Sequence, residues 1–263
     1  MRRAPGAPRA IMRDALHAEW TKLRTSPGTI WLLLAVITLT AAVSLAATAT
    51  VSCPFGGCAV DPTKVSLTGV TIGQAVVAIL AVLAISGEYG TGMIHTSLTA
   101  VPRRTVVLAA KAAVLTALVV PAATIAVLAS LLAGRPILAD HGYQQLPLTD
   151  GSVLRAAAGS VLYLALIALL SLGAASAVRD SAAATAIVLG LLYVFPIIVQ
   201  AVSDPDWRRH LQQIGPMSAG LAIQATTDLS SLPISPWAGL GVLAAWSAAA
   251  LVIGGLLLQL RDA

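Results

Sequence analysis

Charged residues are scarce in this sequence. Only 10% of its 263 residues are Asp, Glu, Lys or Arg, whereas 57% are hydrophobic and the mean hydropathy is +0.87. Soluble domains carry charge on roughly a quarter of their residues, so the composition excludes an ordinary soluble fold and indicates a membrane protein. The net charge of +5 does not indicate a nucleic-acid partner, because the basic residues lie at the ends of apolar runs and form no continuous stripe.

Catalytic motifs are also lacking. None of the three lysines, Lys22, Lys64 and Lys111, follows a glycine, so the chain has no Gly-x-x-x-x-Gly-Lys-Ser/Thr loop and cannot be a P-loop ATPase by itself. It contains neither Gly-x-Ser-x-Gly nor His-Glu-x-x-His, and its four histidines are scattered. The sequence therefore favours neither an enzyme nor a metal site, and we expect no cofactor in this chain.

Six apolar runs are long enough to cross a membrane as helices, because about 20 apolar residues cover a hydrocarbon core of about 30 Å. We therefore predict an all-α polytopic membrane protein in which residues 26–263 form a domain with six transmembrane helices. Prolines at 121 and 196 should kink the third and fifth of them. The predicted spans are residues 30–51, 69–86, 105–133, 153–177, 182–202 and 237–258.

Charges are missing from the middle of every predicted span. Secondary transporters usually place ionisable groups at mid-membrane depth, so their absence argues against such a transporter and indicates an energy source outside this chain. The polar groups that remain are mild, among them Gln74, Tyr163 and Tyr193. We expect most of these groups to form hydrogen bonds between helices.

The distribution of Lys and Arg predicts the orientation of the chain. With the N-terminus inside, 11 of these 16 residues lie on the inner side of the membrane, which places both termini in the cytoplasm. Cys53 and Cys58 then face outwards in the loop CPFGGC. Four residues with two glycines between them can turn back, so a small disulfide is feasible in an oxidising compartment.

The N-terminal residues divide into two parts. Residues 1–10 are basic and rich in proline and alanine, which predicts a flexible tail. Residues 11–25 place apolar and polar side chains on opposite helical faces, which predicts an amphipathic helix in the membrane interface with Trp20 at the headgroup level. Glu19 breaks this pattern, because it projects onto the apolar side and needs a partner there. Its candidate partners are Lys22 on the same helix, or Arg103, Arg104 or Lys111 elsewhere.

A polar segment, residues 87–111, separates the second and third predicted spans. Three glycines, the first of them Gly87, should break the preceding helix. Thr91 would then cap a short helix over residues 91–98, and Pro102 would stop it. The alternative is a solvated loop that only joins two spans.

The last outer segment, residues 203–236, is too long for a simple linker. Asp204 or Asp206 can cap a helix that ends at Gly215. Residues 217–223 are apolar again, so this piece should return toward the bilayer or plug the outer mouth of the bundle. It must then pack on protein, because irregular backbone exposed to lipid is not tolerated.

Several of these features occur together in a known family. The N-terminal helix reads EWTKLRT from Glu19, and the segment after the second span reads GEYGTGMI from Gly87 and then VPRR from Val101. A long outer segment precedes the last span. With six spans and both termini inside, this order of elements resembles an ABC-2 type ABC transporter permease of actinobacterial kind, over nearly the whole chain from about Ala10.

The resemblance implies a multi-pass protein of the bacterial plasma membrane. It implies two permeases, this chain with itself or with a paralogue, docked on two separate ATP-binding subunits that hold ATP and Mg. It also implies a cytoplasmic coupling helix in the polar segment and short extracellular helices before the last span. The residues implied for coupling to the ATPase are Glu88, Tyr89, Thr91, Met93, Ile94, Arg103 and Arg104, and those of the interfacial helix are Glu19, Trp20, Lys22 and Arg24.

The expected function is therefore ATP-driven export, with hydrolysis carried out by a partner subunit. A lipophilic or amphipathic cargo such as a lipid, a peptide or an antibiotic fits spans without buried charge better than a small ion does. The alternative is a non-transporting membrane anchor or scaffold whose basic tail and polar segment recruit a cytoplasmic partner. The CPFGGC loop is not part of the general pattern of the family.

Overall fold

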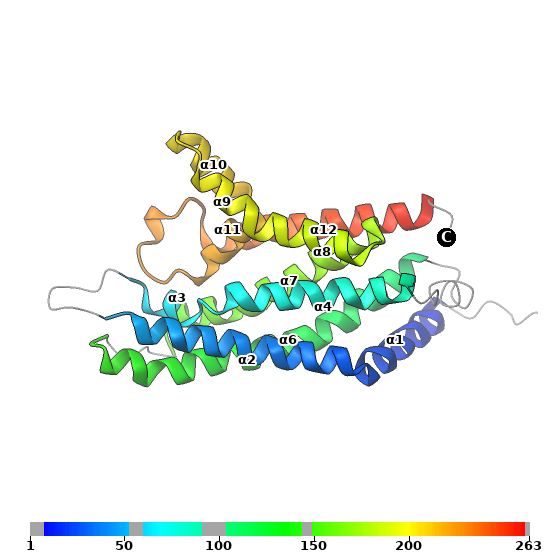
Figure 1. Ribbon diagram of the computed structural model, residues 1–263, viewed down its shortest axis with the longest axis horizontal. Helices are drawn as coiled ribbons and strands as arrows, with labels where there is room; N and C mark the ends of the chain where they lie inside the picture. The colour runs from blue at the N-terminus through cyan, green and yellow to red at the C-terminus, as the bar shows by residue number, and fades with distance from the viewer. Residues whose placement is uncertain (1–7, 53–59, 91–103, 144–148, 261–263) are drawn as a thin grey trace, which may run out of the picture.

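The computed structural model describes residues 8–52, 60–90, 104–143 and 149–260. Within these ranges every regular element is helical, which confirms the prediction of an all-α protein. The long helices run side by side along the longest axis of the molecule (Figure 1).

Five helical stretches are long and apolar enough to cross a membrane. The shortest has 20 residues, which at 1.5 Å per residue extends for about 30 Å, the thickness of a hydrocarbon core. Five of the six predicted spans thus correspond to helices of suitable length and composition. They are α2 (Pro27–Thr50), α6 (Arg104–Asp140), α7 (Gly151–Val178), the succession α8, η1 and α9 (Ser181–Gln200), and α12 (Pro236–Leu260).

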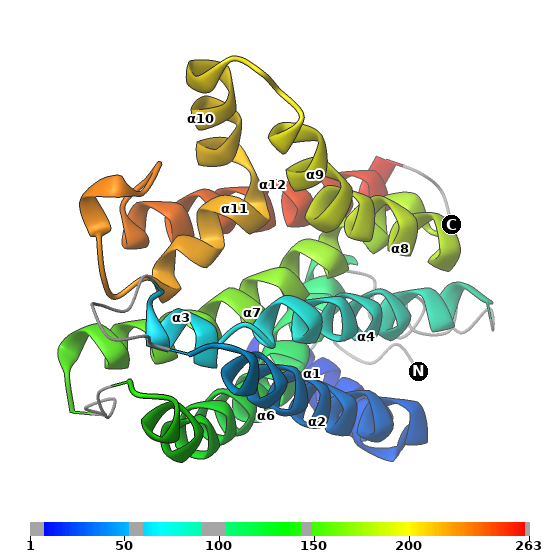
Figure 2. The same ribbon diagram turned by 60° about the vertical axis from the view of Figure 1, so that its left-hand side comes forward.

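The remaining predicted span, residues 69–86, lies within α4 (Val70–Gly90). The apolar part of α4, Val70–Ser86, is shorter than the other five. This helix lies between α2 and α7 (Figure 2), and most of its side chains up to Ser86 are buried. Three glycines were predicted to break this helix, and α4 continues past the first of them, Gly87, to the second, Gly90. A single glycine inside a helix costs only about 1 kcal/mol.

Small residues let α2 and α4 approach each other closely. A Cβ atom added at Gly69 would lie 1.9 Å from the carbonyl oxygen of Thr40, and one at Gly73 would lie 2.2 Å from Thr40 Oγ1. The backbone N–H of Gly69 donates a hydrogen bond to Ser44 Oγ at 3.0 Å. The close contact is typical of membrane helices, which pack through small residues and interhelical hydrogen bonds.

α6 is longer than the sequence predicts. It has 37 residues and continues to Asp140, whereas the predicted span ends at residue 133. Gly134 was expected to lie beyond this helix, but it is buried: a Cβ atom there would lie 3.3 Å from Ser66 Oγ and 3.4 Å from Thr48 Cγ2. The glycine therefore serves close packing, and the helix continues past it.

The two prolines expected to kink spans have different surroundings. α6 continues through Pro121. Pro196 follows η1 (Gly190–Val194), a π-helical stretch between α8 (Ser181–Leu189) and α9 (Phe195–Gln200). A proline cannot donate to the carbonyl four residues back and its ring crowds that carbonyl, and the wider π turn accommodates both effects.

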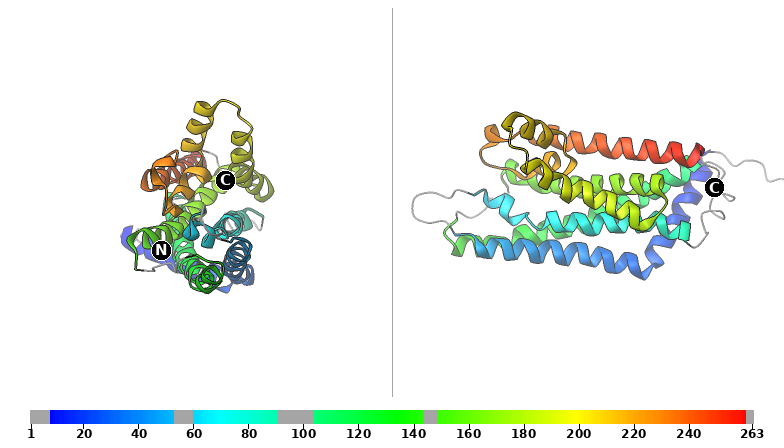
Figure 3. Two further views of the ribbon diagram at one scale, coloured as in Figure 1. Left: turned by 90° about the vertical axis from the view of Figure 1, so that its left-hand side faces the viewer. Right: turned by 45° about the horizontal axis from the view of Figure 1, so that its top comes forward.

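α1 (Pro8–Thr25) lies at an angle to the bundle at one of its ends (Figures 1 and 3). The amphipathic helix predicted over residues 11–25 is present but begins earlier, so residues 8–10 do not belong to the predicted tail. Proline at the first helical position loses no hydrogen bond, which explains the start at Pro8. Apolar Ala15 and Leu23 are buried against the bundle. We call this end, where α4 and α12 also finish, the α1 end.

Short helices cover the opposite end, which we call the α3 end after α3 (Pro62–Ser66). The helix predicted in the last outer segment is confirmed as α10 (Pro205–Ile214), which projects from the bundle (Figures 1 and 2). Asp204 caps it by accepting hydrogen bonds from two backbone N–H groups, at 2.9 and 3.2 Å. Gly215 ends it, as predicted.

The apolar piece that follows α10 packs on protein, as predicted. It forms α11 (Pro216–Gly220) and η2 (Leu221–Gln224), and a short turn, η3 (Leu229–Ser231), comes before α12. Ala219 and Ile223 are fully buried. α11 contacts α12, and η2 contacts both α7 and α12.

Candidate functional site

Glu19 and Lys111 are buried at the α1 end although both side chains are ionisable. Only 5% of Glu19 and 1% of Lys111 are exposed. The Lys111 ammonium donates a hydrogen bond to Glu19 Oε2 at 2.7 Å and another to the carbonyl oxygen of Ala84 at 3.1 Å. Because Glu19 belongs to α1, Ala84 to α4 and Lys111 to α6, one ammonium group joins three helices.

Both kinds of partner considered for Glu19 are used. Lys22 Nζ lies 3.6 Å from Glu19 Oε1, and the Lys22 side chain is 32% exposed. The contact with Lys111 is shorter and almost fully shielded from solvent, so it is the stronger of the two in a medium of low dielectric constant. The Glu19 carboxylate therefore bridges a local lysine and a lysine far away in the sequence.

The buried pair fixes the position of α1. Removing two ions from water is costly, and the cost is offset only when the geometry is good and further hydrogen bonds are made. Here the 2.7 Å contact and the Ala84 carbonyl supply both. Displacing α1 would leave Lys111 buried without its carboxylate, which is much less favourable.

The other residues predicted for the interfacial helix lie at its surface. Trp20 is 39% exposed, and Arg24 is also exposed. An aromatic ring with this mixture of apolar body and polar N–H is typical of the membrane interface.

Three of the seven residues predicted to contact an ATPase belong to the part of the chain that the structure describes. Glu88 and Tyr89 belong to the last turn of α4, and Arg104 is the first residue of α6. The remaining predicted residues, and with them the predicted coupling helix and disulfide, lie outside the described residues. These are Thr91, Met93, Ile94 and Arg103 in the polar segment, and Cys53 and Cys58 in the CPFGGC loop.

Some of the mild polar groups join helices inside the bundle, as predicted. Others, namely Thr38, Thr116, Thr124 and Ser171, donate instead to the carbonyl four residues back in their own helix. The Tyr163 hydroxyl of α7 donates to Gln74 Oε1 of α4, and Gln74 Nε2 contacts Met217 Sδ of α11 at 3.3 Å. The Tyr193 hydroxyl of η1 donates to the carbonyl oxygen of Thr71. Tyr163 and Gln74 are fully buried, so these contacts satisfy polar groups that water cannot reach.

A cluster at the α3 end was not found by sequence reasoning. Asp61 Oδ2 accepts hydrogen bonds from the backbone N–H groups of Thr226 at 2.5 Å and Thr227 at 3.1 Å. Its Oδ1 accepts from Thr226 Oγ1 at 2.7 Å and also caps α3 through Thr63 N at 3.0 Å. We call Asp61, Thr226 and Thr227 the Asp61 clasp. Asp-Pro before a short helix signals the cap, but the sequence carries no signal for the contact across 165 residues.

The Asp61 clasp holds its carboxyl group in the charged form. Burial favours the neutral acid and by itself raises the pKa. The hydrogen bonds from Thr226, from Thr227 and from the backbone of Lys64 favour the carboxylate instead, and together they outweigh burial. The pKa of Asp61 therefore lies below its usual value of 3.8.

A second set of contacts ties η2 and the residues after it to α7. Arg155 Nη2 donates to the carbonyl oxygen of Ala225 at 2.5 Å, and Gln224 Nε2 donates to Ser160 Oγ at 3.1 Å. A Cβ atom at Gly159 would lie 2.0 Å from Ile223 Cγ1, so η2 fits against α7 only because this glycine lacks a side chain.

Within the described ranges, no group of three or more His, Cys, Asp or Glu side chains is placed to hold a metal ion. No protein-family model and no curated protein matches the chain. The composition and the five long apolar helices define a helical multi-span membrane protein.

Proposed function

We propose that this chain is the membrane-spanning subunit of an ATP-driven exporter of the ABC-2 type. One observation carries the proposal: the Glu19–Lys111 pair joins α1 to α4 and α6, the two helices between which the polar segment lies in the sequence. A movement of that segment would reach α1 and the bundle together. In a coupled transporter the part that meets the ATPase must be joined rigidly to the spans in this way.

In this proposal α4 is the sixth span. Its position between α2 and α7 and its buried side chains support that role, because a helix shielded by its neighbours needs a shorter apolar surface than one that faces lipid. With six spans both termini lie on the same side of the membrane. The excess of Lys and Arg on that side makes it the cytoplasm.

The proposed mechanism depends on a separate ATP-binding subunit. ATP binding would close a pair of such subunits and move the polar segment, including Glu88, Met93 and Ile94. Packed helices have discrete arrangements, so this motion would shift the population between inward-facing and outward-facing states. A lipophilic or amphipathic cargo along the interface of two permeases fits spans whose centres carry mild polar groups only.

Co-purification and ATP hydrolysis test this function. The chain, isolated in a gentle detergent from its native host, should retain a P-loop protein, and ATP hydrolysis by that complex should respond to cargo. Replacing Met93 and Ile94 with alanine should abolish the response and leave basal hydrolysis intact. Arg209→Ala on α10, at the opposite end, is the matched control and should change neither.

Two results would contradict the proposal. Retention of a cytoplasmic partner without ATPase activity would favour the anchor or scaffold instead. An unchanged cargo response in the Met93 and Ile94 variant would remove the polar segment from the coupling mechanism.

A further inference from the structure

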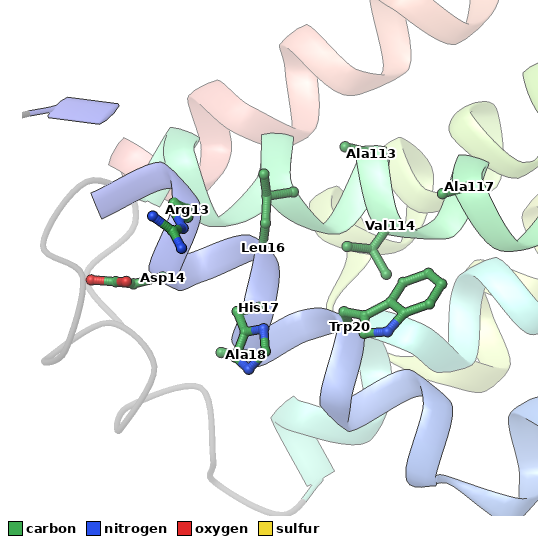
Figure 4. A pocket seen from close by; sticks show the side chains of 9 residues that line it. All are labelled: Arg13, Asp14, Leu16, His17, Ala18, Trp20, Ala113, Val114 and Ala117. Carbon is green, nitrogen blue, oxygen red and sulfur yellow. The ribbon is translucent and has the colours of Figure 1, made fainter. Parts of the chain in front are cut away.

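An open groove of about 940 Å³ runs between α1 and α6 (Figure 4). Two of its lining residues, Ala18 and Trp20, flank Glu19 in the sequence. Ligand pockets usually measure roughly 300–1,000 Å³, so this groove has room for a bound molecule. It lies at the α1 end, where the amphipathic helix meets the bundle.

The floor of the groove is apolar. Ala113 and Ala117 lie one turn apart on α6 and are exposed, and their small side chains leave the space open. Leu16 and Trp20, also one turn apart, point from α1 toward them (Figure 4). A hydrocarbon chain can lie along such a surface and remove it from water.

The rim of the groove is polar. Arg13 and His17, one turn apart on α1, are both exposed. Asp14 is the acidic residue among those that line the groove, and in Figure 4 it points away from α6. A phosphate group at the rim would therefore meet the Arg13 guanidinium without facing the Asp14 carboxylate.

The two walls are held at a fixed separation. Lys111 lies on α6 two residues before Ala113, and its ammonium is bound to Glu19. Glu19 in turn lies on α1 between Leu16 and Trp20 in the sequence. A preformed site saves the entropy that a flexible one would lose on binding.

We propose that this groove binds one anionic phospholipid, with its phosphate at Arg13 and one acyl chain along Ala113 and Ala117. The charge of the segment supports this occupant, since the first 25 residues contain six Lys or Arg and two acidic residues. One of those two, Glu19, is already paired with Lys111. Basic side chains next to a membrane attract anionic lipid, and tryptophan is enriched at the level of the lipid headgroups. The proposal is independent of any ATP-driven function.

Native mass spectrometry of the full-length chain tests it. The purified protein is titrated with dioleoyl phosphatidylglycerol and, separately, with dioleoyl phosphatidylcholine, so that only the headgroup differs. We expect one tightly retained phosphatidylglycerol and weaker retention of phosphatidylcholine. Arg13→Ala should weaken phosphatidylglycerol binding about fivefold, the effect of one basic side chain near a membrane, whereas Arg24→Ala, outside the groove on the same helix, should not.

The apolar floor is tested by filling it. Ala117→Leu should remove the retained lipid, whereas Ala133→Leu, at an exposed position near the other end of α6, should leave it bound. If Ala117→Leu prevents folding, the proposal is tested by comparing phosphatidylglycerol retention in Arg13→Ala and Arg24→Ala. Equal retention of both lipids, equal effects of the paired variants, or a protein that carries no lipid would overturn the proposal.

Discussion

Lys111 is fully buried, and the Glu19 carboxylate beside it decides whether that burial is tolerated. Exposed ion pairs contribute little because water competes for both charges. Removing one partner of a buried ion pair is far more costly, because it leaves the other charge buried and unpaired. The two residues should therefore behave as a unit when they are substituted.

Glu19→Gln should destabilise the protein by about 3–5 kcal/mol, the usual cost of breaking a buried ion pair from one side. The double variant Glu19→Gln with Lys111→Met should recover much of that loss, because no unpaired charge remains. Thermal unfolding of the purified protein in one detergent measures both. Lys22→Met, which removes the longer and partly exposed contact with Glu19, is the control and should have a small effect. Equal losses in all three would contradict the account.

Asp61 should make the stability of the α3 end depend on pH. Its pKa in the folded protein is lowered below 3.8, so its contribution is fully present above that value and is lost as the pH falls through the lower folded pKa. Unfolding temperatures measured between pH 6 and pH 3 should fall in the wild type. Asp61→Asn should begin less stable and show a flatter profile, and an identical slope in the variant would exclude the clasp.

Contact between α7 and α12 depends on the absence of a side chain at Gly173. A Cβ atom there would lie 2.5 Å from the carbonyl carbon of Ala250, and backbone atoms cannot move aside easily. Gly173→Ala should destabilise the bundle by about 1–3 kcal/mol, as overpacking does. Gly241→Ala in α12 is the matched control, since a Cβ atom at that position meets nothing within 4 Å. Thermal unfolding separates the two variants, and equal melting temperatures would show that α7 and α12 do not pack this closely.

The presence and approximate position of the long apolar helices could be predicted from the sequence, but several of their ends could not. Apolar runs of about 20 residues without charge fix where membrane helices lie, because a helix satisfies all its backbone groups within one segment. Gly87 was interpreted as a break from its intrinsic preference, and the third span was expected to end before Gly134. Both helices continue past these residues. At Gly134 the close contacts with Ser66 and Thr48 account for it, since the local cost of a glycine is only about 1 kcal/mol.

The ion pair at the α1 end was partly predictable and the clasp was not. Glu19 breaks the amphipathic pattern of its helix, which signals a buried partner, and Lys111 was among the candidates. Asp61 lies in a polar stretch where a carboxylate needs no special explanation. Its partners, Thr226 and Thr227, become neighbours only when η2 docks on α7, and no local pattern reports that contact.

Polar contacts between segments far apart in the sequence lie at both ends of the molecule. At the α1 end Glu19 and Lys111 bind α1 to the bundle, and at the α3 end the Asp61 clasp joins the segment before α3 to the segment before α12. Long helices between the two sets of contacts move as rigid bodies more readily than they deform. In the proposed mechanism a shift at one end therefore reaches the other.

Cross-linking at Ile94 tests the central claim, that the polar segment meets an ATP-driven partner in the cytoplasm. A photoreactive amino acid replaces Ile94 in the full-length chain, and intact cells are irradiated, with Trp207 on α10 as the control position. The account predicts a covalent adduct between position 94 and a P-loop protein, with a yield that changes with ATP, and none from position 207. Absence of such an adduct, or labelling of a cysteine at position 94 from outside the cell, would contradict it.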